Sequence, residues 1–321
     1  MQKQLIEYKK DDKILGFFLL KSKTLRTSNK GSEYLDLVIS DRSGDMIAKV
    51  WDLTMPDTEH AREIESRTVV KIKGAITDFN GQRQAKILKI RPARPDDPVE
   101  LSTLIPSAPL ESEDMYREIL EKAQAISDPD FRTLTTALLE ENRDRLAYFP
   151  AASRNHHAIK GGLLYHVYRM LQTALAVCRI YPVLSRDVLV CGVILHDIAK
   201  LDEIDANELG IAEKYTFEGE MLGHIVQGIK IIDAKCRALG IPDEKRVMVE
   251  HMILSHHYEP EYGSPKKPMF PEAEMLHFLD LMDARMYDIE KSLEGVAPGE
   301  FSDKIYSMDN RKMYKAGFEE E

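Results

Sequence analysis

The feature that most restricts the fold of this 321-residue chain is a histidine, an aspartate and a lysine at the end of an apolar helix. Ser185 can cap the start of that predicted helix, and the run 188–195 is almost continuously apolar, so the helix should be buried. His196, Asp197 and Lys200 follow it. A buried carboxylate without a partner is costly, so Asp197 should face a cation, a metal ion or both. A purely structural His–Asp pair is the alternative.

The other histidines favour a metal site. Nine of the ten, all except His60, lie between residues 156 and 277. Five segments of this region have helical periodicity, and each contributes one or two side chains of the types that bind metals. In chain order these side chains are His166, His196 with Asp197, His224, His256 with His257, and Asp280.

This order resembles the HD-domain metal-dependent phosphohydrolases. The resemblance implies an all-α helical bundle in whose core these side chains meet. Cleavage of a phosphodiester needs hydroxide at neutral pH, which a divalent ion supplies by lowering the pKa of its bound water. Seven ligand side chains are too many for one tetrahedral ion, so we expect two ions. Asp197 would bridge them, with His166, His196 and Asp280 mainly on one ion and His224, His256 and His257 mainly on the other.

The types of ligand limit which metal ions fit the site, and the position of Lys200 relative to Asp197 indicates the catalytic residues. Imidazoles and carboxylates without a thiolate suit Mn, Fe, Co, Ni or Zn, with Mg as a further option, and the family resemblance favours Mn. Lys200 follows Asp197 by one helical turn and can neutralise charge on a phosphoryl oxygen, so Asp197 and Lys200 are the predicted catalytic residues.

Other polar residues flank this set. Asp283 lies one turn after Asp280 and can orient a ligand histidine. The remaining histidines have weaker roles: His156 and His157 can touch substrate, His251 should face away from His256, and His277 is either a surface residue or a partner of Asp280.

The N-terminal part differs from the rest in charge. Residues 1–95 hold 19 Lys and Arg against 13 Asp and Glu, whereas the remainder holds 25 against 41. A basic module is therefore joined to an acidic one. A basic surface that serves only solubility is the alternative.

The pattern of residues 1–95 predicts an all-β barrel. Strands are expected over 14–24, 34–40, 46–51, 68–79 and 84–90, with turns at 28–31 and 80–81 and a short helix over about 57–66. Three strands, a helix and two strands resemble the nucleic-acid-binding OB-fold domains. Such barrels bind single strands with aromatic platforms flanked by cations. The candidate platforms, each of which can instead be a core residue, are Tyr34, Trp51 and Phe79; the candidate phosphate contacts are Lys21, Lys23, Arg26, Lys49 and Arg83.

Prolines in 91–98 end the barrel, because they suit neither a β-ladder nor a helix interior. We expect an OB-fold domain over 1–95, a linker over 96–110 and a helical HD domain over 111–321. The first two helices of the HD domain, over 111–126 and 130–148, would precede the helices that carry the metal-binding residues. Three cysteines without CxxC spacing, a charged N-terminus and the absence of an apolar run of about 18 residues predict a soluble, cytoplasmic protein with no membrane partner.

An OB-like module before an HD bundle, together with the motifs in 253–257 and 261–268, resembles the YhaM-type bacterial 3′→5′ exoribonucleases. The resemblance implies a metal-dependent enzyme that degrades single-stranded RNA, and DNA as a further candidate, to nucleoside 5′-monophosphates. Homo-oligomers are compatible with the sequence. Two alternatives stay open: an HD phosphohydrolase of a small nucleotide, and a single-stranded nucleic-acid-binding regulator with a structural metal site.

Overall fold

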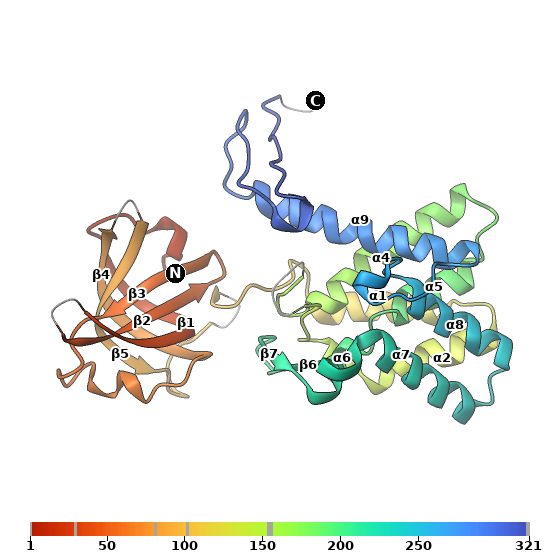
Figure 1. Cartoon of the computed structure of the whole chain (residues 1–321), viewed down its shortest axis with the longest axis horizontal. Coiled ribbons are helices and arrows are strands. Elements are labelled where there is room, and N and C mark those ends of the chain that lie inside the picture. Colours follow the sequence, from red (N-terminus) through yellow and green to blue (C-terminus); the bar gives the residue numbers. More distant parts are fainter. Residues whose placement is uncertain (1, 29–30, 80–81, 101–102, 153–156, 319–321) are drawn as a thin grey trace. The chain divides into compact units, whose positions relative to one another are not determined.

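The computed structural model describes residues 2–28, 31–79, 82–100, 103–152 and 157–318 (Figure 1). The chain divides into two compact units, Met1–Ser107 and Ala108–Glu321. This division falls inside the segment 96–110 that the sequence predicts as a linker. The predicted turn residues 29–30 and 80–81 lie outside the described residues.

The first unit is a closed five-stranded barrel. Its strands are β1 (Lys13–Thr27), β2 (Glu33–Asp41), β3 (Gly44–Val50), β4 (Thr68–Phe79) and β5 (Gln82–Pro92), and their order around the barrel is β1–β2–β3–β5–β4. β3 and β5 run parallel, whereas the other neighbouring pairs run antiparallel. The predicted OB-like barrel is confirmed.

Alternating apolar side chains fill the barrel. Leu35, Leu37 and Ile39 of β2 are buried, as their period of two requires. The N-terminal segment adds to this core, because Leu5 and Tyr8 are also buried. The backbone N–H of Leu5 donates to Asp41 Oδ2 at 2.6 Å, which ties the 3-10 turn η1 (Leu5–Glu7) to the end of β2.

The helix predicted over 57–66 is longer than the element that the structure shows. The structure has only a 3-10 turn there, η2 (Glu59–Arg62). Thr58 precedes this turn but does not cap it, because its hydroxyl donates to the carbonyl of Asp52 at 2.6 Å. Without a cap, the first backbone N–H groups of a longer helix would lack an acceptor.

The second unit is helical. Its helices are α1 (Ser112–Gln124), α2 (Pro129–Glu141), α3 (Arg143–Leu146), α4 (Gly162–Ile180), α5 (Arg186–Leu195), α6 (Lys200–Glu203), α7 (Phe217–Leu239), α8 (Asp243–Ser255) and α9 (Pro271–Leu293). A small hairpin, β6 (Ile204–Ala206) and β7 (Ala212–Tyr215), and the 3-10 turns η4 (Pro260–Tyr262) and η5 (Tyr306–Met308) complete the described elements. The all-α character predicted for this unit is confirmed apart from the hairpin.

Helix α5 lies at the centre of this unit. It contacts α1, α2, α4, α8 and α9, and all its residues from Val188 to Leu195 are buried. The Ser185 hydroxyl caps it by accepting from the N–H of Val188. The helix ends at Leu195, and a turn over 196–199 separates it from α6.

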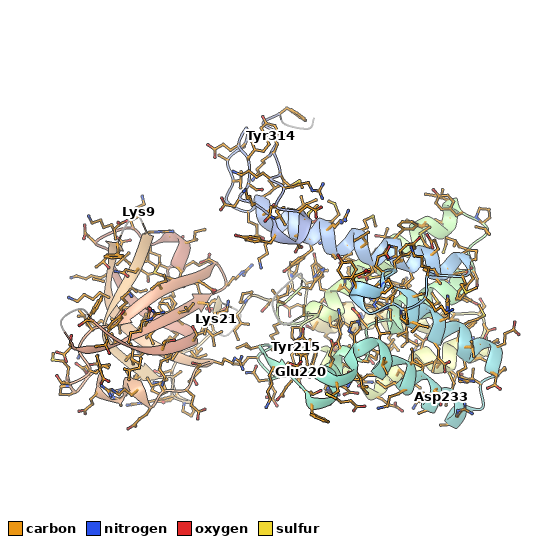
Figure 2. All side chains as sticks on the ribbon, in the orientation of Figure 1. Lys9, Lys21, Tyr215, Glu220, Asp233 and Tyr314 are labelled. Atoms are coloured by element: carbon orange, nitrogen blue, oxygen red, sulfur yellow. The ribbon has the colours of Figure 1, made fainter. Side chains whose placement is uncertain are left out.

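Two further boundaries differ from the prediction. The helix expected over 130–148 is split into α2 and α3 at Asn142, whose side chain donates to the carbonyl of Leu138. After α9 the chain folds back on itself near Tyr314 (Figure 2). Isolated β-bridges join Phe301 to Tyr314 and Ile305 to Arg311. Among the described helices, none combines the length and apolar character needed to cross a membrane.

Candidate metal centre and nucleic-acid surface

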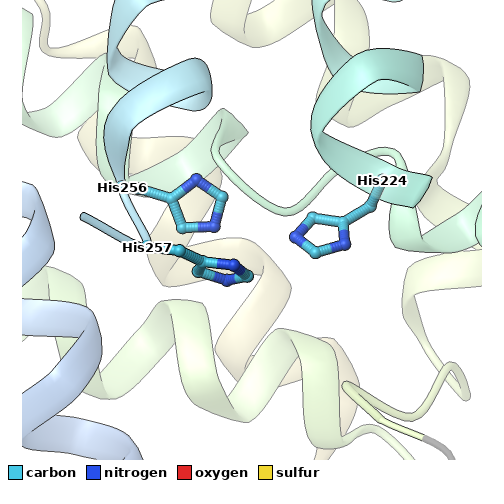
Figure 3. Close-up of side chains that lie close together, drawn as sticks. All are labelled: His224, His256 and His257. Atoms are coloured by element: carbon cyan, nitrogen blue, oxygen red, sulfur yellow. The ribbon is translucent and has the colours of Figure 1, made fainter. Parts of the chain in front are cut away.

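The helical unit brings the predicted metal-binding side chains together around Asp197. His166 comes from α4, His196 and Asp197 from the turn after α5, and His224 from α7. His256 and His257 lie at the end of α8, and Asp280 lies on α9. Figure 3 shows His224, His256 and His257 side by side.

The two oxygens of Asp197 face different histidines. Asp197 Oδ2 lies 3.3 Å from His196 Nε2 and 3.9 Å from His166 Nε2. Asp197 Oδ1 lies 3.5 Å from His224 Nε2 and 3.8 Å from His256 Nε2. His166 Nε2 is also 3.3 Å from Asp280 Oδ1. The carboxylate thus stands between two groups of imidazoles.

Hydrogen bonds fix how these rings point. The Nδ1 atoms of His196, His256 and His257 donate to the backbone carbonyls of Val193, Ile253 and Tyr262 at 2.9, 2.7 and 2.7 Å. The Nδ1 atoms of His166 and His224 donate to the carboxylates of Asp283 and Glu203 at 2.8 and 3.0 Å. A histidine whose Nδ1 carries the proton presents the Nε2 lone pair to a metal.

Unsatisfied buried atoms collect at the same place. Within the described part of the chain, His196 Nε2, His224 Nε2, His256 Nε2 and Asp197 Oδ1 are buried without a hydrogen-bond partner. Buried polar atoms in native proteins are nearly always paired, so four together call for a bound group. The sets His224, His256, His257 and His166, His196, Asp197 each place ligand atoms within 4.8 Å of one another. These nitrogen and oxygen donors fit a divalent metal ion.

Charges inside the site are strongly coupled. Burial opposes ionisation of Asp197, but the Lys200 ammonium at 2.7 Å and the His196 imidazole outweigh it and hold its pKa well below the ordinary value. Burial also disfavours a charged His166, yet Asp280 and Asp283 raise its pKa to about 9, so metal binding would displace the proton from its Nε2. Burial, with His257 and His196 nearby, lowers the pKa of His256 and keeps it neutral, the form that binds metals.

Glu203 is a site residue that the sequence interpretation missed. Its Oε1 accepts hydrogen bonds from both the backbone N–H and the Nδ1 of His224, at 2.9 and 3.0 Å. Two glycines allow this approach. A Cβ on Gly219 would lie 2.2 Å from the carbonyl oxygen of Glu203, and Gly223 has φ 68° inside α7, which turns the His224 N–H toward Glu203. The signal in the sequence is the spacing of Asp197, Lys200 and Glu203 three residues apart.

Replacement of Glu203 by glutamine should therefore weaken metal binding by about 10- to 100-fold. The amide is a weaker acceptor for the His224 Nδ1 proton and can present its NH₂ group instead. The measurement is calorimetric titration of metal into the metal-free protein. Glu208→Gln, in the turn between β6 and β7, is the matched control, and equal affinities for Glu203→Gln and wild type would contradict the role.

Asp283 holds the opposite side of the site. Its Oδ2 accepts from His166 Nδ1 and from His157 Nε2, both at 2.8 Å, and its Oδ1 accepts from Arg169 Nε at 2.6 Å. Arg169 also pairs with Glu290 at 2.7 Å. Asp283 thus makes the orienting contact to a ligand histidine that its helical spacing predicts, and His157 and Arg169 in turn hold Asp283 in place.

The remaining histidines have structural contacts. His157 is completely buried, so it cannot touch substrate as considered from the sequence, and His156 lies outside the described residues. His277 Nδ1 donates to the carbonyl of His256 at 2.8 Å, which favours a supporting role over a surface role. His251 Nε2 accepts from the N–H of Met269 and stays apart from the site.

The barrel presents an aromatic and cationic surface. The rings of Tyr34 and Trp51 stack with centroids 4.5 Å apart, and Lys49 Nζ lies 5.1 and 5.6 Å from the two centroids. Trp51 is 42% exposed and Phe79 is 64% exposed, so neither is a core residue of the barrel. Exposed rings beside cations are what single-stranded nucleic acids bind.

The other predicted cations divide into two kinds. Lys21 is exposed and pairs with Asp45 at 2.7 Å (Figure 2), and Arg26 pairs with Asp36 at 3.0 Å. Lys23 instead donates to the carbonyls of Arg62 and Ile64, and Arg83 donates to those of Ile6 and Tyr8. The fold already satisfies Lys23 and Arg83, so they are less available to phosphates than Lys21 and Arg26.

Comparisons with known proteins agree with this architecture. The model of the HD domain family matches residues 163–285, and a model described as a putative helicase matches residues 108–185. A 3′-5′ exoribonuclease YhaM from Geobacillus sp. (strain WCH70) is 40% identical over 99% of this chain and 96% of its own length. Those of Oceanobacillus iheyensis and Halalkalibacterium halodurans are 38% and 37% identical, over 95% and 100% of this chain and 94% and 98% of their own lengths.

Among solved structures, the second OB-fold domain of replication protein A from Methanococcus maripaludis is similar to 31% of this chain and covers that whole domain. Its identity is 12% and its TM-score is 0.23, so the barrel assignment rests on strand order instead.

Proposed function

This chain belongs to the YhaM family of 3′-5′ exoribonucleases, and from that premise we propose that it is a metal-dependent enzyme that removes nucleotides from the 3′ end of single-stranded RNA. Relatives of 37–40% identity that span nearly the whole chain support this activity. Nucleoside 5′-monophosphates are the proposed products. Three free cysteines suit the reducing cytoplasm, where we expect the enzyme to act.

The placement of Asp197 between two groups of histidines is the observation that carries the catalytic proposal. Asp197 and the histidines on its two sides would together hold two divalent ions, and the family resemblance favours Mn. His166, His196 and Asp280 would hold one ion, and His224, His256 and His257 would hold the other. When bound, the ions supply hydroxide at neutral pH and stabilise the charge that develops on phosphate.

The chain's own residues supply position and charge. The carboxylates of Glu203 and Asp283 keep the His224 and His166 rings turned toward the centre. The Lys200 ammonium, 2.7 Å from Asp197, is close enough to contact a phosphoryl oxygen of a substrate bound there. The barrel surface around Tyr34, Lys49 and Trp51 would hold the RNA upstream of the cleaved bond by stacking and ion pairing.

A turnover assay tests this proposal. Purified protein with Mn²⁺ should convert a 5′-labelled poly(A) oligonucleotide into a ladder shortened from its 3′ end and release AMP, and EDTA should stop the reaction. A DNA oligonucleotide of the same length measures sugar preference. Hydrolysis of mononucleotides with intact poly(A) would instead identify a small-nucleotide phosphohydrolase. Tight RNA binding without turnover with Mn²⁺, Fe²⁺, Co²⁺, Ni²⁺, Zn²⁺ or Mg²⁺ would identify a binding protein.

Trp51→Ala should weaken RNA binding by roughly tenfold, because stacking on one aromatic contributes about 1–3 kcal/mol per base. Hydrolysis of a small phosphodiester such as bis(p-nitrophenyl) phosphate should stay unchanged, since Trp51 belongs to the other compact unit and is not one of the metal-site residues. Fluorescence anisotropy with labelled poly(A) in EDTA measures the binding. Tyr306→Ala, an 88% exposed aromatic of the helical unit, is the control. An unchanged Kd for Trp51→Ala would remove Trp51 from the RNA surface.

A further inference from the structure

A second cationic surface lies on the barrel wall formed by β4 and β5. In the register of these antiparallel strands, Lys71 stands opposite Arg91 and Lys73 stands opposite Lys89. Like charges placed directly across a strand pair destabilise a sheet. Two such pairs in succession therefore have a cost to folding that an anionic ligand would offset.

This wall is hollowed. A cavity of about 280 Å³ is lined by Lys71, Lys73, Lys89 and Arg91 together with His60 and Leu15. Leu15 is 60% exposed, and Lys71 Nζ lies 5.0 Å from the ring centroid of Phe17. The hollow thus combines a cationic rim with exposed apolar surface, which can contact a base or a ribose while the cations contact phosphates.

Acidic neighbours satisfy only part of the positive charge. Lys89 pairs with Asp57 at 2.7 Å, and Arg91 makes two hydrogen bonds of 2.6 and 2.7 Å to Asp97. Lys71 reaches Asp97 only at 4.0 Å, and Lys73 makes no ion pair with a described residue. The β4 side of the wall therefore keeps two ammonium groups available to a ligand.

We propose that this wall, defined by Lys71, Lys73, Lys89 and Arg91, is a second binding site for the phosphodiester backbone of single-stranded RNA. Cations two positions apart on a strand are separated by about 6.8 Å, so successive phosphates can meet successive lysines. The choice of RNA as the polyanion rests on the proposed function.

This site is separate from the aromatic surface. β5 pairs with β3 through residues 84–86, whereas Lys89 and Arg91 lie further along β5 and pair with β4. Tyr34 belongs to β2 and Trp51 follows β3. An RNA held on both surfaces would pass around the barrel, which lengthens the strand that the enzyme grips. Binding should therefore depend on oligonucleotide length beyond what the aromatic surface alone can cover.

The test is RNA binding by a full-length Lys71→Gln, Lys73→Gln variant, measured by anisotropy with labelled poly(A) in EDTA. At 50 mM salt the Kd should rise about tenfold, and the slope of log Kd against log salt should fall by roughly 1.4, about 0.7 for each lost phosphate contact. Lys9→Gln, Lys10→Gln is the matched control on the same unit, at two exposed positions, and should bind like wild type.

Folding and charge are checked separately. The double glutamine variant removes opposed like charges, so its thermal midpoint should not fall below that of wild type. The variant Lys71→Arg, Lys73→Arg keeps the charge and should bind RNA within about a factor of two of wild type.

Three outcomes would overturn this site: a glutamine variant with unchanged Kd and salt slope, an arginine variant that binds as poorly as the glutamine one, or a control that loses as much affinity. An acidic protein as the true ligand would give the first outcome. A wild-type protein that binds RNA but releases no AMP with metal would instead refute the proposed function and leave the binding site standing.

Discussion

Asp197→Asn should lower RNA turnover at least roughly a thousandfold, equivalent to about 4 kcal/mol of transition-state stabilisation. The two oxygens of Asp197 stand between His196 and His224, and the amide keeps their volume but loses the negative charge. Two cations held close together with one fewer anion repel each other more strongly, so at least one ion should leave. The barrel is a separate compact unit, so RNA affinity should stay within about a factor of three.

Elemental analysis, RNA anisotropy in EDTA and poly(A) turnover measure these three effects on one protein preparation. Asp202→Asn is the matched control, because Asp202 lies on α6 near the site but is half exposed and pairs with Arg145. It should keep metal and activity. Near-normal RNA degradation by a folded Asp197→Asn protein would refute the bridging role of Asp197 and the assignment of catalysis to the HD site.

The sequence pattern picked out side chains that the structure brings together where residue type and helical period coincide. His166, His224 and Asp280 each lie on a helix whose apolar face is readable, so the fold had to direct them inward. The inward position of His196 and Asp197 could also be predicted, because a run of buried apolar residues precedes them. The positions of the barrel strands along the chain followed from period-two alternation and turn residues, whereas the barrel itself was implied by the resemblance to OB-fold domains.

Supporting residues could not be predicted, because their roles depend on contacts between distant segments. Glu203 reaches His224 only because Gly219 lets α7 approach its backbone. The contact between His157 and Asp283 joins residues 126 positions apart. Neither contact leaves a periodic signal in the sequence. The same limit explains the cations of the barrel, since the bonds of Lys23 and Arg83 to backbone carbonyls depend on how loops close over the strands.

The second large effect concerns Lys200, the mostly buried ammonium beside Asp197. Lys200→Ala should lower poly(A) turnover about a hundredfold, equivalent to about 2.7 kcal/mol of transition-state stabilisation, while metal content stays near that of wild type. A protonated lysine cannot be a metal ligand, so its removal should not empty the site. The loss of its positive charge should instead destabilise the transition state, in which negative charge develops on the phosphoryl oxygens. Lys214→Ala, at a 73% exposed side chain of the same unit, is the control.

Stability separates this role from a structural one. Without metal, Lys200 offsets the buried charge of Asp197, and its loss leaves that carboxylate without its nearest cation. The metal-free Lys200→Ala protein should therefore unfold at a lower temperature than metal-free wild type, and added Mn²⁺ should restore more of its midpoint than it adds to wild type. Turnover that stays low after this recovery places Lys200 at the phosphate, whereas turnover that recovers together with the midpoint would mean that Lys200 serves only to hold Asp197.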